Sequence, residues 1–217
     1  MQETLNFLTA LKENNQREWL EAHKSTYEST RKDFSDFVSQ VLKEIIVFEP
    51  TFAPLEPKDC IFRLYRDVRF SKDKTPYKTN YSAYFAEGGR KSTKAGYYLH
   101  IEPGNKSMLA GGIYMPMPEE LKKIRQEIDY NGETFTTILS QPDFVKYFGK
   151  LSGSTLKTIP KGYAADHPSI ELLKHKDFTV FHQLTDAEVV KPGLLQHISH
   201  VWKTLKPLND FLNQAVE

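Results

Sequence analysis

Residues 60–84 read CIFRLYRDVRFSKDKTPYKTNYSAY, the stretch in which charged and aromatic residues are together most frequent. Its part from 61 to 80, here called the basic segment, has six cations and two acids, so its net charge is +4, against +1 for the whole chain. Cations this closely spaced repel one another unless an anion lies among them. Arginine forks, lysines and tyrosine hydroxyls bind phosphate, sulfate or carboxylate groups. The predicted anion-binding residues are Arg63, Arg66, Arg69, Lys72, Lys74, Tyr77 and Lys78.

The same stretch begins the predicted sheet. Residues 61–70 fit a strand or a helix by pattern, and we favour a strand that ends in a turn at 66–69, because the apolar run is short and bounded by prolines. Residues 71–78 lack periodicity and contain Thr75-Pro76, which predicts a loop. Residues 80–86 then read as a returning strand.

Helices are predicted on both sides of this region. Apolar residues follow helical spacing in 4–11, then for about 30 residues from Gln16, and again in 194–215. Another helix should begin at Pro118 and end at Asn131-Gly132, since proline favours the first helical position and this pair favours a helix end. Shorter helices are predicted over 143–149 and 169–174.

The remaining strands lie in the middle of the chain. Residues 96–102 alternate in polarity, and a Pro-Gly-Asn turn joins them to 108–115, which predicts an antiparallel hairpin. Residues 176–184 read as a further strand. This order predicts an α+β fold with a mainly antiparallel sheet and long N- and C-terminal helices packed on it. The length fits a single domain over 1–217.

Composition narrows the classes of protein. Hydrophobic residues make up 39% and charged residues 26%, as in ordinary folded proteins, and the balanced total charge gives no global case for a nucleic-acid or membrane partner. The single cysteine, Cys60, excludes an internal disulfide framework and fits a reducing compartment. We find neither a signal-peptide pattern nor an apolar run of about 18 residues. A cytoplasmic protein without a membrane partner is therefore expected.

Other polar residues could extend the site. His100 and Glu102 lie two apart on one strand face, a spacing that suits an acid–base pair or metal ligands, but also the wet face of a hairpin. Arg125, Lys161 and Tyr163 could join the same cleft, or serve as a core-edge ion pair and a turn. No HExxH, GxSxG, P-loop or dinucleotide-binding pattern occurs, so we predict no metal and no cofactor.

Several longer motifs carry a resemblance to a known family. They read FRLYRDVRFSKDKTPYKTNYSAYF at 62–85, AGYYLHIEPG at 95–104, LAGGIYMP at 109–116, LKKIRQEID at 121–129 and PKGY at 160–163. In these motifs the chain closely resembles the family catalogued as domain of unknown function 2461, over almost its whole length. The resemblance implies one intact α+β domain, typical of bacterial and fungal cytoplasmic proteins. It implies no established activity and no catalytic residues.

The sequence leaves three uses for the basic segment. It could bind a phosphorylated or other anionic small molecule, with or without catalysis. It could be a binding module for nucleic acid, the less favoured partner, or for an acidic protein. In that use the stacking surfaces would be exposed Tyr77, Tyr81 and Tyr84. It could also be a structural cluster in which Arg63 pairs with Asp67, Lys72 pairs with Asp73, or the cations pair with acids of the long helix. No feature specifies an oligomeric state.

Overall fold

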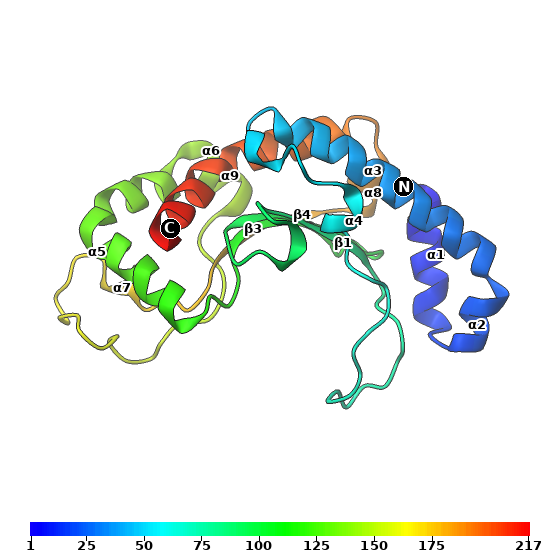
Figure 1. The fold of residues 1–217 in the computed structure, drawn as a ribbon, viewed down its shortest axis with the longest axis horizontal. Helices are drawn as coiled ribbons and strands as arrows, with labels where there is room; N and C mark the ends of the chain where they lie inside the picture. Colours follow the sequence, from blue (N-terminus) through cyan, green and yellow to red (C-terminus); the bar gives the residue numbers. More distant parts are fainter. The chain divides into compact units, whose positions relative to one another are not determined.

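Nine α-helices and one four-stranded antiparallel sheet make up the computed structural model, which describes residues 1–217 (Figure 1). The predicted α+β class with long terminal helices is therefore confirmed. The chain divides into two compact units. The first comprises Met1–Lys91, Tyr98–Leu109 and Gln183–His200, and the second Ser92–Tyr97, Ala110–His182 and Val201–Glu217. The expectation of a single domain stays a prediction.

The sheet follows the order of its strands along the chain, β1-β2-β3-β4. Its strands are β1 (Tyr81–Phe85), β2 (Gly96–Ile101), β3 (Ser107–Ile113) and β4 (Phe178–Leu184). The predicted hairpin is confirmed by β2 and β3. Alternation of polarity identified it correctly, because Tyr97, Leu99 and Ile101 of β2 are all fully buried.

The first unit contains the four N-terminal α-helices. They are α1 (Gln2–Glu13), α2 (Arg17–Ala22), α3 (Lys24–Ile46) and α4 (Pro57–Cys60), with α8 (Asp186–Val190) and the 3-10 turns η1 (Pro50–Phe52) and η2 (Gly89–Lys91). The long helix predicted from Gln16 is broken at His23, whose φ of −109° and ψ of 23° are not helical. Helix α1 packs against α3 through an apolar stripe that includes the fully buried Leu8 and Val38.

The predicted strand at the start of 61–70 is not a regular strand. Only single bridges form there, between Ile61 and Ala83 and between Tyr65 and Tyr77. Pro76 has no N–H and cannot donate to a ladder, although its carbonyl accepts from the Arg66 N–H at 2.9 Å. Beyond these bridges the chain extends away from β1 as a long loop, teal in Figure 1.

The second unit contains α5 (Pro118–Ser140), α6 (Pro142–Phe148), α7 (Ile170–Leu173) and the part of α9 (Leu194–Val216) from Val201 on. Helix α5 is longer than the helix predicted from Pro118, but its one non-helical residue, Asn131 (φ −123°, ψ 33°), lies at the predicted end. A Cβ at Gly111 of β3 would collide with Leu205 of α9, so this close approach requires glycine. None of the helices combines the length and the apolar character that a membrane span requires.

Asp177 fixes two loops of the second unit just before β4. Its carboxylate accepts hydrogen bonds from the Met115 N–H at 2.9 Å, the Ser154 N–H at 3.0 Å and the Ser154 hydroxyl at 2.7 Å. Burial alone would raise the pKa of Asp177, but these hydrogen bonds outweigh it, and the pKa lies below its ordinary value. The charged form is therefore the one that the fold needs.

Asp177→Asn is expected to lower the free energy of unfolding by about 1–3 kcal/mol at neutral pH, because an amide NH₂ would then face the converging donors. The folded pKa lies below the unfolded value of about 3.9, so this stabilisation is complete above that value and is lost as the pH falls through the folded pKa. Urea unfolding of the wild-type protein and of Asp177→Asn at pH 7 and pH 3 measures this loss of unfolding free energy. The exposed Asp166→Asn is the control; an equal effect of both variants, or an undiminished effect of Asp177→Asn at pH 3, would contradict this role.

Candidate functional site

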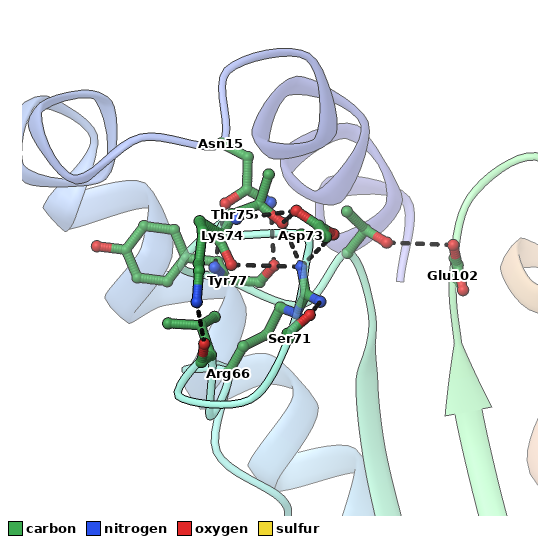
Figure 2. A network of polar contacts seen from close by, with 10 residues as sticks. Asn15, Arg66, Ser71, Asp73, Lys74, Thr75, Tyr77 and Glu102 are labelled. Carbon is green, nitrogen blue, oxygen red and sulfur yellow. Dashed lines mark hydrogen bonds and ion pairs between the residues drawn. The ribbon is translucent and has the colours of Figure 1, made fainter.

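Asn15, in the connection between α1 and α2, holds the basic segment against the N-terminal helices (Figure 2). Its side-chain Nδ2 donates to the Tyr77 carbonyl at 3.0 Å, and the Tyr77 N–H donates back to Oδ1 at 3.0 Å. Tyr77 is buried, and its ring meets the edge of the Tyr65 ring at 5.2 Å between centroids. Tyr77, which was predicted to bind an anion, holds this anchoring position and also lines the smaller of the two clefts described below; anion binding by Tyr77 stays a prediction.

A cleft of about 550 Å³, here called the larger cleft, lies between α3 and the start of the basic segment. That volume is in the range of small-molecule sites. Four cations line the cleft and no carboxylate does. The cations are Arg31, Lys58, Arg63 and Arg90, and the tyrosines among them are Tyr27, Tyr65 and Tyr81.

The cations of the larger cleft differ in how they are already engaged. Lys58 pairs with the exposed Glu56 at 2.5 Å, and Arg90 donates to the Lys58 carbonyl oxygen. Arg31 and Arg63 form no ion pair, and both are exposed, although Arg31 also donates a hydrogen bond to the Tyr27 hydroxyl. The charges of these two guanidinium groups are therefore not neutralised and are available to an anion.

Lys78 and Arg63 place two cations near each other without an acid between them. Burial lowers the pKa of Lys78, and the positive charge of Arg63 lowers it further. The Lys78 ammonium lies 5.3 Å from the centroid of the Phe62 ring, and Phe62 lines the larger cleft. A bound anion would relieve this repulsion and raise the pKa of Lys78.

A second cleft of about 440 Å³, here called the smaller cleft, shares Tyr27 and Tyr65 with the larger one. Its cations are Arg17, Lys24 and Arg66, and Glu21 is its single acid.

The tip of the loop is closed by its own contacts. Arg66 pairs with Asp73 at 2.5 Å and also donates to the Thr75 hydroxyl (Figure 2). The Thr75 N–H and Arg66 together lower the pKa of Asp73 to about 2. Lys74 donates to the Val68 carbonyl at 3.0 Å. Arg66 is thus neutralised locally, although its side chain also lines the smaller cleft.

Arg69 is likewise bonded within the loop. Its guanidinium donates twice to Asp67, at 2.9 and 2.6 Å, and lowers the pKa of that carboxyl to about 2. The ion pairs of the segment are therefore Arg66–Asp73 and Arg69–Asp67, not the Arg63–Asp67 and Lys72–Asp73 pairs considered from sequence. Arg69, Lys72 and Lys74 line neither cleft.

His100 and Glu102 belong to a hydrogen-bonded relay on β2 and the residues around it. His100 Nε2 lies 2.8 Å from Glu102 Oε2, and His100 Nδ1 lies 3.1 Å from the Tyr98 hydroxyl. Thr79 donates to the other Glu102 oxygen at 3.2 Å. In the neutral tautomer Nε2–H donates to the carboxylate while Nδ1 accepts from Tyr98. The predicted His–Glu pair exists, but it lines neither described cleft.

The other predicted residues lie in the second unit. Arg125 donates to the backbone carbonyls of Leu173 at 2.9 Å and His175 at 3.2 Å, and burial lowers its pKa. This satisfies the arginine without the ion pair considered from sequence. Burial raises the pKa of Tyr163, and Lys161 is exposed. A cleft shared by these three residues and the basic segment stays a prediction.

Sequence reasoning missed much of the cleft lining because it lies far from the basic segment along the chain. One signal was available: Lys24, Tyr27 and Arg31 are spaced by three and four residues, which puts them on one face of α3. Nothing local identified the others. The missed residues outside the basic segment are Asn15, Arg17, Lys24, Tyr27, Arg31, Lys58 and Arg90, and Tyr65 was missed within it.

Comparison with known proteins identifies a family. The family model described as Conserved hypothetical protein (DUF2461) matches residues 3–211, which confirms the resemblance seen in the motifs. The search of curated proteins and the search of solved structures each gave no match. The family description names no ligand or activity, so function has to be argued from the clefts.

His100→Ala and Glu102→Ala are each expected to lower the free energy of unfolding by about 1–3 kcal/mol, because each leaves a buried polar partner unsatisfied. Their double variant should lose less than the sum, with a coupling energy of about 0.5–3 kcal/mol. Urea unfolding of the wild-type protein, the two single variants and the double variant completes a double-mutant cycle. The exposed Lys32–Asp36 pair on α3 is the control and should show a clearly smaller coupling; additive effects at His100 and Glu102 would refute the relay.

Proposed function

We propose that this chain, which belongs to the DUF2461 family of conserved hypothetical proteins, binds a phosphorylated or otherwise anionic small molecule in the larger cleft. The observation that carries the proposal is a lining with four cations and no carboxylate. Arg31 and Arg63 are the principal contacts, because neither forms an ion pair within the protein and the only side-chain hydrogen bond between Arg31 and the cleft is to the Tyr27 hydroxyl. Lys78 contributes charge from beside Phe62.

Tyrosine hydroxyls supply the uncharged donors. Burial raises the pKa of Tyr27, against the opposing effect of Arg31, and burial also raises that of Tyr81. Both phenols therefore stay protonated at neutral pH. The Thr30 hydroxyl donates to the Tyr27 carbonyl, so the Tyr81 O–H donates to Thr30, and the Tyr27 hydroxyl is the one that can donate to an anion oxygen. Hydrogen bonds to a charged group each contribute about 1.5–3 kcal/mol, so two arginine forks with one such phenol suffice for binding of a small ligand.

The three tyrosines considered as stacking surfaces for nucleic acid are not exposed in the structure. Tyr77 and Tyr81 are 4% and 5% exposed, and Tyr84 is largely buried, so the expectation that they are exposed is wrong. Tyr65, at 51%, is the exposed tyrosine of the clefts. This favours a small ligand over a long nucleic-acid strand.

A cytoplasmic location is part of the same proposal. Cys60 is fully buried, and burial raises the pKa of its thiol to about 12. It therefore acts as a small core residue, which is compatible with a reducing compartment.

Arg63→Ala should abolish anion-dependent thermal stabilisation without lowering the Tm of the free protein, because the side chain is exposed and unpaired. A ligand at 100 times its dissociation constant stabilises by about 2.7 kcal/mol. For a chain of this size that raises Tm by about 5–10 °C. The measurement is a thermal-shift screen with phosphate, sulfate, sugar phosphates and nucleotides.

Arg69→Ala is the matched control, since Arg69 is an exposed arginine of the same segment that lines neither cleft. It should keep the stabilisation. A screen in which no anion raises Tm, or in which Arg69→Ala loses the effect and Arg63→Ala keeps it, would reject the larger cleft as the site.

A further inference from the structure

The larger and smaller clefts meet at Tyr27 and Tyr65, which line both. We infer that they are two subsites of one elongated site, and that its ligand is a linear molecule with at least two phosphate-type groups joined across these tyrosines. The inference rests on the proposed function of the larger cleft and adds the ligand class.

One wall of this elongated site is a face of α3. Lys24 lines the smaller cleft, Tyr27 both clefts and Arg31 the larger cleft, in that order along the helix. The seven-residue step from Lys24 to Arg31 covers about 10 Å of helix axis. The wall thus has a cation on each side of a central tyrosine.

The other wall repeats the order within the basic segment. Arg63 lines the larger cleft, Tyr65 both clefts and Arg66 the smaller cleft. The chain bends at Leu64, so the three-residue step from Arg63 to Arg66 covers at most about 10 Å. The two walls therefore present the same order of cation, tyrosine and cation, which fits two anionic groups and a linker.

The two subsites differ in strength. In the larger cleft Arg31 and Arg63 form no ion pair, and no acid lines the cleft. In the smaller cleft Arg66 is tied to Asp73, and Glu21 lies among the cations. The larger cleft should thus hold the first phosphate-type group and the smaller cleft the second.

Two sources could supply this ligand chemistry, a polyphosphate chain or a short nucleotide strand. Both repeat phosphate groups along a line. They differ in that only nucleotides offer rings to stack on the half-exposed Tyr65.

The test compares dissociation constants of orthophosphate, tripolyphosphate and 5′-phosphorylated trithymidylate by calorimetry, at about 150 mM salt. Linking two groups across two subsites should make the better linear ligand bind about tenfold or more tighter than orthophosphate. Arg17→Ala combined with Lys24→Ala removes two exposed cations of the smaller cleft and should reduce this gain to less than about threefold. Lys43→Ala, an exposed lysine elsewhere on α3, is the control and should keep the gain.

A gain seen with tripolyphosphate identifies the polyphosphate chain. A gain confined to trithymidylate and lost in Tyr65→Leu identifies the nucleotide strand. Equal affinity for orthophosphate and both linear ligands, or a gain that survives Arg17→Ala with Lys24→Ala, overturns the two-subsite inference while leaving the larger cleft intact. Absence of binding by all three probes, or binding that Arg63→Ala does not weaken, overturns the proposed function itself.

Discussion

The two hydrogen bonds between Asn15 and the backbone of Tyr77 are the constraint on which both clefts depend. The basic segment has only single bridges to its neighbours, so no continuous ladder holds it in place. The Asn15 amide takes the place of a partner strand, because it satisfies both the N–H and the carbonyl of Tyr77. Burial of Tyr77 then positions Tyr65 at the boundary of the clefts.

The charge of the basic segment divides into two parts with different consequences. At the loop tip Arg66 and Arg69 meet Asp73 and Asp67, and such exposed pairs add little stability while they define the shape of the loop. At the base Arg63 and Lys78 repel each other and neither forms an ion pair, although the charge of Asp67 also acts on Arg63. An arrangement of unpaired cations disfavours the empty state, and it is this cost that makes the base of the segment, rather than its tip, the candidate binding site.

The sequence predicted features that depend on local pattern. The β2–β3 hairpin followed from alternation of polarity, and the irregular residue of α5 fell at Asn131, where the helix was expected to end. The anion-binding character of the basic segment was inferred from its charge, but charge alone could not separate Arg63 from Arg69. That difference depends on which guanidinium finds an aspartate nearby.

Features that depend on distant contacts could not be predicted in the same way. Arg90 reaches the larger cleft from η2 and carries no local sign of its role, whereas the spacing of Arg31 with Lys24 and Tyr27 shows only that the three share a face of α3. The start of 61–70 has a strand pattern, yet its pairing with the segment containing Pro76 remains limited to single bridges, because proline cannot donate. The role of Asn15 could not be seen in the sequence, since its partner lies 62 residues away.

The most direct test of the central claim is an X-ray diffraction experiment on crystals soaked in tungstate, a phosphate-like anion with a strong anomalous signal. We expect the principal anomalous peak in the larger cleft, within hydrogen-bonding distance of the guanidinium groups of Arg31 and Arg63. A larger cleft without a peak, or peaks confined to the loop tip around Arg69 and Lys72, would contradict the assignment of the binding site.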